Sequence, residues 1–165
     1  MEGEWSVELK NFGLIRISQD FIKRISNYRQ LNEGVPESGG VLLGGFLNTG
    51  GALLIHDFTP PQKTDKQGRC LYFRSEMHNK LVQEIWEESN NHITYVGLWH
   101  THPEPVPNYS HIDKRDWVNS LKNSHYDGKQ LFFFIIGQTH IRCWIGINRR
   151  FNSSFNLIGE YEFVK

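Results

Sequence analysis

The chain has 165 residues, of which 38% are apolar and 13% aromatic, which is enough to build one compact domain around its own core. Its 18 Lys and Arg residues equal its 18 Asp and Glu residues, which argues against a protein that works by neutralising nucleic-acid phosphates. No run approaches the ~18 apolar residues of a membrane span, and the acidic N-terminus lacks the apolar segment of a signal peptide, so we expect a single cytoplasmic domain over residues 1–165 with no nucleic-acid or membrane partner.

The first third of the chain predicts short strands, one helix and a hairpin. Ser18 is a suitable helix N-cap, and the apolar residues that follow it recur at helical spacing as far as about Tyr28. Residues 32–40 are rich in glycine and contain a proline, so they predict a loop. The turn-forming residues 49–51 separate two apolar runs and predict a β-hairpin. The strands expected here span residues 13–17, 41–48 and 52–58.

The middle of the chain predicts a loop, a strand and a second helix. Residues 60–68 are polar and begin with proline, so we expect a loop there, before a strand at residues 70–74. Ser75 is expected to cap a helix that ends near Asn90 and Asn91. One face of this helix is apolar and comprises Leu81, Val82, Ile85 and Trp86.

The last part of the chain predicts four strands and a third helix. Residues 93–101 form a strong strand pattern, and the prolines in residues 103–109 require a loop. Ser110 is expected to cap the helix, whose apolar residues are Ile112, Trp117, Val118 and Leu121. Further strands are expected at residues 131–138, 140–148 and 156–164. This mixture of strands, hairpins and helices predicts an α+β fold or a mixed-sheet sandwich with helices packed on it.

The two cysteines, Cys70 and Cys143, each lie in an apolar, strand-like run. We interpret both as buried thiols rather than as a disulfide, which a domain of this size does not need. Their spacing matches no cysteine zinc motif.

The residues with the clearest chemical meaning are His100 and His102. On a strand, residues two apart point to the same side, so the two imidazoles project together while Trp99 and Thr101 face the other way. Two imidazoles at this separation are able to share one zinc ion. A helical metalloprotease would instead carry its two histidines four residues apart.

A third ligand is needed, because a catalytic zinc usually has three protein ligands and one open position. Asp113 is well placed, at the third helical position after Ser110 and beyond a proline-stiffened loop that returns the chain toward the strand end. Asp116, one turn later, is the alternative; His111 diverges from Asp113 on the helix surface. A purely structural interpretation also exists, in which Ser110 and Asp113 are only an N-cap and an acidic first turn.

The spacing of His100, His102, Ser110 and Asp113 resembles the JAMM signature of the JAB/MPN metalloproteases. Glu37, which precedes Ser38, Gly39 and Gly40, fits the glutamate motif frequent in prokaryotic members of that family. The resemblance extends over residues 13–148. It implies a cytidine-deaminase-like α+β domain with a mixed sheet and flanking helices.

The resemblance also implies roles for these residues. His100, His102 and Asp113 would bind Zn²⁺, and Glu37 would act as general base without ligating the metal. Ser110 would donate a hydrogen bond to the developing oxyanion. The glycines after Glu37 would allow the backbone to approach closely. Glu33 is the competing base, although it lacks the neighbouring glycine pair.

Active relatives of this family mostly hydrolyse the isopeptide bond between a ubiquitin-like C-terminus and a lysine. A narrower likeness, at residues 97–105, Pro107, Trp117 and the helix at 74–89, is to the JAB proteases of bacterial anti-phage CBASS operons. Those relatives remove a cGAS-like nucleotidyltransferase (CD-NTase) from the proteins to which it is joined. We expect an extended substrate tail to be clamped by strand addition, with residues 60–68 and those beyond as the prime clamp. Because that loop is short, ubiquitin itself is the less favoured substrate.

Other functions stay open at this point. A JAB hydrolase that processes a sulfur carrier or another ubiquitin-like protein would use the same site. RadC-like proteins share the pattern but tend to carry Asn between the histidines and Ser-Gly after the proline, where this chain has Thr101, Glu104 and Pro105. A non-catalytic MPN scaffold would typically lack part of the ligand set. The oligomeric state is undetermined.

Overall fold

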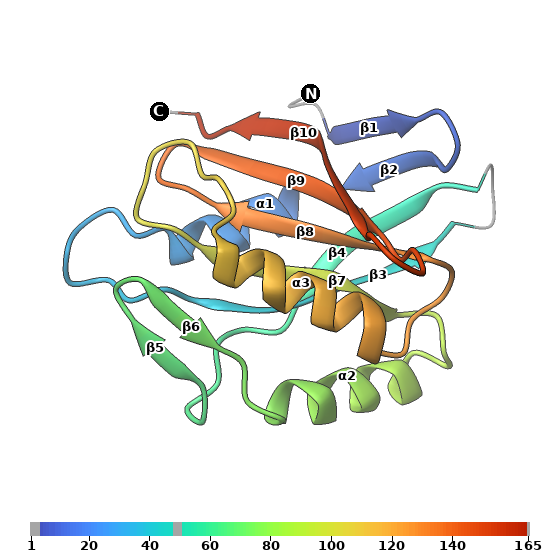
Figure 1. Ribbon diagram of the computed structural model, residues 1–165, viewed down its shortest axis with the longest axis horizontal. Helices are drawn as coiled ribbons and strands as arrows, with labels where there is room; N and C mark the ends of the chain where they lie inside the picture. The colour runs from blue at the N-terminus through green and yellow to red at the C-terminus, as the bar shows by residue number, and fades with distance from the viewer. Residues whose placement is uncertain (1–3, 48–50, 165) are drawn as a thin grey trace.

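One mixed sheet of eight strands organises the molecule (Figure 1), and its strand order is β1-β2-β4-β3-β7-β8-β9-β10. The computed structural model describes residues 4–47 and 51–164. The pairs β2/β4 and β7/β8 are parallel and the other neighbours are antiparallel. The strands of this sheet are β1 (Trp5–Leu9), β2 (Gly13–Ile17), β3 (Gly39–Phe46), β4 (Leu53–Phe58), β7 (Thr94–Thr101), β8 (Gln130–Ile136), β9 (His140–Ile147) and β10 (Ser154–Glu162). The predicted α+β class with a mixed sheet and flanking helices is confirmed.

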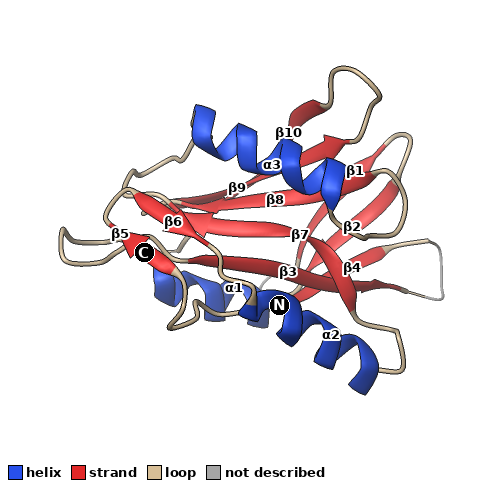
Figure 2. Cartoon of the chain, turned by 60° about the horizontal axis from the view of Figure 1, so that its bottom comes forward, coloured by secondary structure: helices blue, strands red, loops and turns tan. Residues whose placement is uncertain are grey.

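Helices cover both faces of the sheet (Figure 2), where α1 (Gln19–Ile25) and α3 (His111–Asn123) lie on opposite sides. A short 3₁₀ turn, Ser26–Tyr28, continues α1. The apolar residues of α1 join one core cluster, whereas Trp117 of α3 joins a second cluster on the other face, to which α2 (Met77–Glu88) also contributes. Strand β8 supplies alternate residues to the two clusters, which explains why it reads as a continuous apolar run.

The packing of Trp117 fixes the position of α3 on the sheet. Its indole is 1% exposed and stacks on Phe133 with ring centroids 4.5 Å apart. Truncating a buried aromatic side chain of this size typically costs about 3–5 kcal/mol. The N-terminus of α3 therefore sits firmly near the C-terminal end of β7, where His100 and His102 lie.

Most local predictions are confirmed. Ser18 Oγ accepts a hydrogen bond from Phe21 N (3.2 Å) at the start of α1, and the strands at both sides of the predicted hairpin pair as β3 and β4. The hairpin turn at residues 49–51 falls largely outside the described residues. Helix α2 ends at Glu88, and Asn90 and Asn91 follow it with positive φ angles of 53° and 66°. None of the helices in the described part of the chain is long and apolar enough to cross a membrane.

Several predictions were wrong in detail. Strand β1 was not predicted, and residues 60–68 are not entirely a loop, because β5 (Lys66–Gly68) pairs with β6 (Leu71–Phe73) in a separate small sheet. Ser75 does not cap α2: the N-cap position is Glu76, and Ser75 N instead donates to Asp65 Oδ1 (2.8 Å). Sequence periodicity could not detect β5, because a strand of three residues is too short to show an alternating pattern. It is recognised by its hydrogen bonds to β6.

Exposure also differs from expectation at three positions. Cys143 is a buried free thiol as expected, but Cys70 is exposed because it lies in the turn between β5 and β6. Trp86 is 37% exposed on α2 and Ile112 is 60% exposed on α3, so each helix leaves part of its apolar face uncovered.

Candidate metal centre

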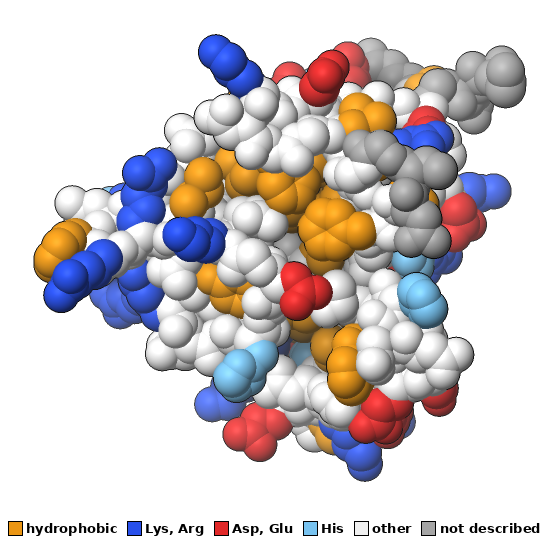
Figure 3. Space-filling view, turned by 90° about the vertical axis from the view of Figure 1, so that its right-hand side faces the viewer, with side chains coloured by type: hydrophobic (Ala, Val, Ile, Leu, Met, Phe, Trp, Pro, Cys, Tyr) orange, Lys and Arg blue, Asp and Glu red, His pale blue; other side chains and the backbone are white. Residues whose placement is uncertain are grey.

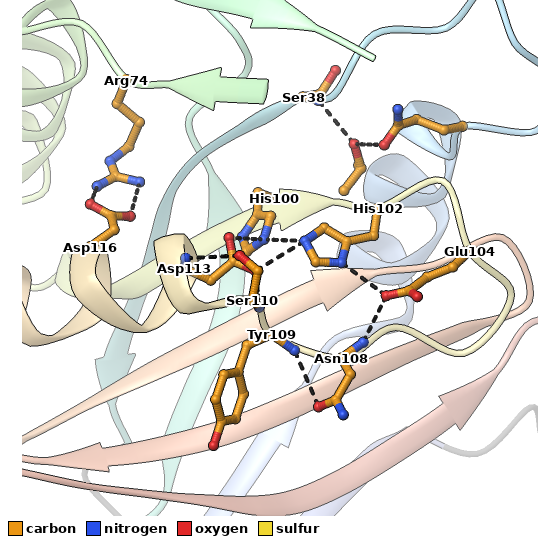
Figure 4. A network of polar contacts seen from close by, with 12 residues as sticks. Ser38, Arg74, His100, His102, Glu104, Asn108, Tyr109, Ser110, Asp113 and Asp116 are labelled. Atoms are coloured by element: carbon orange, nitrogen blue, oxygen red, sulfur yellow. Dashed lines mark hydrogen bonds and ion pairs between the residues drawn. The ribbon is translucent and has the colours of Figure 1, made fainter. Parts of the chain in front are cut away.

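His100, in β7, and His102, directly after the end of that strand, project to the same side, as the sequence predicts (Figure 4). Their Nε2 atoms lie 3.0 Å apart, and the His100 ring also approaches the Trp117 indole. Trp99 belongs to the core cluster on the opposite face of the sheet. The two imidazoles therefore aim at one shared point on the α3 face.

Asp113, at the start of α3, completes a group of three. Its Oδ1 lies 3.1 Å from His100 Nε2, and its Oδ2 lies 3.1 Å from His102 Nε2. Ligand atoms at three corners of a tetrahedron with bonds of ~2.0–2.1 Å are separated by ~3.3 Å. Two imidazole nitrogens and a carboxylate at these separations suit a zinc ion in both donor chemistry and spacing.

The helix cap holds the Asp113 carboxylate in this orientation. Ser110 Oγ accepts a hydrogen bond from Asp113 N (3.1 Å), and Asp113 Oδ2 accepts one from Ser110 N (2.8 Å), which together form a capping box. The two residues therefore do cap the helix, and this role is compatible with a chemical one. The cap uses Ser110 Oγ as an acceptor, so its hydroxyl hydrogen is free to be donated to another group.

Charges inside the group shift its protonation. Burial alone would raise the pKa of Asp113, but hydrogen bonds from His100 and His102 outweigh burial and hold that pKa far below its usual range. Burial alone would lower the pKa of His102, but Asp113 and Glu104 raise it to about 9. A metal ion bound at His102 would therefore have to compete with a proton for the ring nitrogen.

Glu37 lies beside this group on the segment that precedes β3. Gly39 pairs with His100 in the β3–β7 ladder, and Thr101 N donates to Ser38 O (2.9 Å), so Glu37 comes alongside His102. The side chain is buried, and within the described ranges no group donates a hydrogen bond to its carboxylate. Burial raises the pKa of Glu37 to about 7, with a lowering by His102 and a further raising by Asp113.

The glycines after Glu37 are required by close packing. A Cβ atom on Gly39 would lie 2.4 Å from the Tyr72 ring, and one on Gly40 would lie 2.1 Å from Thr59 O. Only glycine fits at these two positions without displacing the neighbouring backbone or ring, so the expected close approach is present.

The alternative residues considered from the sequence lie elsewhere. Glu33 is 89% exposed and its carboxylate lies 3.5 Å from Arg69, so it is solvated rather than buried beside the histidines. Asp116 binds both terminal nitrogens of Arg74, at 3.0 and 2.7 Å, and His111 is exposed. The predicted group His100, His102 and Asp113 comes together, and these three alternatives do not join it.

Glu104 was not predicted to have a role, yet its carboxylate orients His102. Glu104 Oε1 lies 3.0 Å from His102 Nδ1 and also accepts a hydrogen bond from Asn108 N (2.9 Å) (Figure 4). An acceptor at Nδ1 favours the tautomer that leaves Nε2 available to a metal.

We expect Glu104→Ala to weaken zinc binding about 10–100-fold, because the ring of His102 loses the group that fixes its orientation. Zinc dissociation constants measured by competition with a chromophoric chelator would check this. Glu33→Ala, which removes an exposed glutamate from a nearby loop, is the control. Equal affinity in the two variants would contradict the role of Glu104.

The small β5–β6 sheet is tied directly to the Glu37 segment. Glu37 N donates to Gly68 O (2.7 Å), Gln67 Nε2 donates to Glu37 O (2.9 Å), and the Tyr72 hydroxyl lies 2.7 Å from Gly39 O. The segment proposed from the sequence as a substrate clamp, residues 60–68 and those beyond, includes this hairpin, which borders the site.

Asp65 holds the two ends of this hairpin segment together. Its carboxylate accepts hydrogen bonds from Gln62 N and Ser75 N, both at 2.8 Å, and lies 2.8 Å from Nε2 of the buried His78. His78 is 1% exposed, so Asp65 is its partner in the interior of the protein. This pair was missed because no local spacing connects residues that are 13 positions apart.

We expect Asp65→Asn to destabilise the protein by about 2–4 kcal/mol at pH 7. Burial alone would raise the pKa of Asp65, but hydrogen bonds from Gln62 N, His78 and Ser75 N lower it far below the unfolded value of about 3.9. A depressed folded pKa gives stability that is present above the unfolded pKa and lost as pH falls toward the folded one.

The difference between wild type and Asp65→Asn should therefore shrink as the pH falls below about 4. Urea unfolding of both proteins at pH 7, 5 and 3.5, with chelator present throughout, would measure it. Asp20→Asn, in an exposed ion pair with Arg24, should change stability by less than about 0.5 kcal/mol. A difference between wild type and Asp65→Asn that does not change with pH would contradict the assignment.

A groove lies away from these residues, at the other end of α3. It has a volume of about 530 Å³ and runs between α2 and the C-terminal end of α3. Figure 3 looks onto this end of the molecule, where apolar side chains gather centrally and Lys and Arg gather at one side. None of the residues that line this groove belongs to the group of His100, His102 and Asp113.

The chain is similar in sequence to known proteins over most of its length. Residues 22–146 match the family described as prokaryotic homologs of the JAB domain. A protein of Escherichia coli strain TW11681, named CD-NTase/cGAS isopeptidase, is 33% identical over 131 residues, which cover 79% of each chain. Proteins with the same name from Vibrio cholerae serotype O1 and Pseudomonas aeruginosa are 32% and 31% identical, over 83% and 81% of this chain and 83% of each relative.

Proposed function

Because this chain belongs to the prokaryotic family of JAB-domain proteins, we propose that it is a zinc-dependent isopeptidase that cleaves a protein C-terminus from a lysine side chain. The observation that carries the proposal is the group of His100, His102 and Asp113, with ligand atoms 3.0–3.1 Å apart and Glu37 buried beside them.

In this proposal His100, His102 and Asp113 hold one Zn²⁺. When bound, Zn²⁺ acidifies water and polarises the carbonyl of the scissile bond. The capping box and the Glu104 contact keep Asp113 and His102 in the orientation that the ion requires.

Glu37 serves as the general base and acid. Its poorly solvated carboxylate takes a proton from the attacking water, whose oxygen adds to the carbonyl carbon. The bond from carbon to the lysine nitrogen then breaks, and Glu37 returns the proton to that nitrogen. The products are a free C-terminal carboxylate and a free lysine amine. Ser110 donates its hydroxyl hydrogen to the carbonyl oxygen while that oxygen carries negative charge.

We propose that the conjugated protein is a CD-NTase, so that the enzyme reverses CD-NTase conjugation in a CBASS anti-phage system. Support comes from the three relatives named CD-NTase/cGAS isopeptidase. The substrate tail would lie extended against the β5–β6 hairpin, which borders Glu37 through the bond from Glu37 N to Gly68 O.

We further propose that residues 1–165 form one catalytic domain that acts in the cytoplasm. The large sheet includes strands from Trp5 at one end of the chain to Glu162 at the other. Both cysteines are free thiols, which suits a reducing compartment.

The proposal is tested by offering the purified protein a panel of lysine-linked adducts of a CD-NTase, ubiquitin and a sulfur carrier. We expect cleavage of the CD-NTase adduct at the isopeptide bond, read by intact mass, and loss of cleavage after zinc removal. Cleavage of only the sulfur-carrier or only the ubiquitin adduct would overturn the substrate assignment. No cleavage of any adduct by zinc-loaded protein would overturn the enzymatic proposal.

A further inference from the structure

Thr101 lies between the two proposed zinc ligands but faces the opposite side of β7, where it is completely buried. Its Oγ1 accepts a hydrogen bond from Ser38 N (2.9 Å), and its hydroxyl donates to Gln30 Oε1 (2.9 Å). In Figure 4 the dashed line that starts at Ser38 marks the first of these contacts. A backbone N–H is only a donor, so the direction of both bonds is fixed by chemistry.

Gln30 is 1% exposed and uses its whole amide group. While its Oε1 accepts from Thr101, its Nε2 donates to Val35 O (3.1 Å) and to Arg69 O (2.8 Å). Two carbonyl partners at Nε2 and a hydroxyl donor at Oε1 leave one consistent orientation of the amide. A buried network in which every member is satisfied holds its parts rigidly.

The contacts of Gln30 and Thr101 join three segments that meet at the site. Val35 and Ser38 belong to the segment that carries Glu37, and Arg69 lies in the turn of the β5–β6 hairpin. Thr101 is the last residue of β7, between His100 and His102. The Glu37 segment, the hairpin and β7 are thus joined to one another through the side chains of Gln30 and Thr101.

Glu37 depends on these contacts because it lies outside the β3–β7 ladder, whose first pair is Gly39 with His100. Thr101 N donates to Ser38 O, but the return bond from Ser38 N goes to the Thr101 side chain instead of to a backbone carbonyl. Among the described residues, the partners of the Glu37 backbone groups lie in the hairpin, at Gly68 and Gln67.

We propose that Thr101 and Gln30 are positioning residues that hold Glu37 at its working distance from His100 and His102 and join it to the hairpin. This inference rests on the proposed function of the site. Neither side chain reaches substrate or metal, so both act through Glu37. A displacement of about 1 Å in a catalytic group is enough to cost ~10²-fold in rate.

The test compares Thr101→Val, which has nearly the same shape but no hydroxyl, with Thr101→Ser, which keeps the hydroxyl. We expect Thr101→Val to lower kcat about 10–100-fold with KM and zinc content unchanged, and Thr101→Ser to stay within about 3-fold of wild type. Gln30→Leu should reproduce the effect of Thr101→Val. The control, Tyr126→Phe, removes a hydroxyl that donates to Leu121 O (2.7 Å) at the far end of α3, and should leave kcat unchanged.

Two outcomes would overturn the inference. If Thr101→Val and Thr101→Ser have the same kcat, the hydroxyl does not position the base. If Tyr126→Phe lowers kcat as much as Thr101→Val at similar loss of Tm, the effect is one of general stability.

A second measurement separates this inference from the proposed function. Hydrogen exchange of the Ser38 amide in zinc-loaded protein needs no substrate, and we expect it to be at least about 10-fold faster in Thr101→Val than in Thr101→Ser. Equal exchange in these two variants would refute the network. Wild-type protein that cleaves no adduct would refute the proposed function, while the exchange result would still decide the role of Thr101.

Discussion

Replacing Glu37 by Gln is expected to lower kcat about 10²–10⁴-fold while the protein keeps its fold and its zinc. Glutamine has nearly the same shape as glutamate but accepts no proton from water at neutral pH. Because the proposed role is proton transfer rather than substrate binding, KM should change little. Steady-state kinetics on the cleaved adduct, with zinc measured by elemental analysis in the same samples, would check the prediction.

Glu33→Gln is the matched control for this substitution. It makes the same chemical change four residues earlier, at a side chain that is 89% exposed, and should leave both kcat and zinc unchanged. Zinc loss in Glu37→Gln would indicate a ligand rather than a base. Cleavage by Glu37→Gln at the wild-type rate would remove Glu37 from the mechanism.

Replacing Asp113 by Asn is expected to abolish stoichiometric zinc binding and, with it, activity. The loss of affinity should exceed the 10–100-fold typical of residues that only support a ligand, because one of three ligands loses its charge. Asparagine still accepts the hydrogen bond from Ser110 N, so the helix cap and the fold should survive. Zinc content and the zinc-dependent rise in Tm would both report the change.

Asp116→Asn provides the control, since Asp116 is the acidic residue one turn later on the same helix. It binds Arg74 instead of approaching the histidines, so its replacement should lower stability but leave the zinc content intact. Full zinc occupancy in Asp113→Asn, or zinc loss in Asp116→Asn, would show that the third ligand has been wrongly assigned.

Much of the site was predictable from residues close in sequence. The two-residue period of a strand places His100 and His102 on one face, and Ser110 marks the start of the helix that carries Asp113. These relations hold because backbone geometry over a few residues is set by local hydrogen bonds and side-chain shape. The motif likeness added Glu37, which no local periodicity connects to the histidines.

Contacts between distant segments could be decided only by the tertiary structure. Glu37 reaches His102 through the register of β3 on β7, Glu104 turns back onto the ring of His102, and Gln30 meets Thr101 across 71 positions. The exposure of Cys70 and the burial of His78 likewise follow from the pairing of β5 with β6. Each arrangement depends on packing free energy summed over the whole sheet, which no short window of sequence contains.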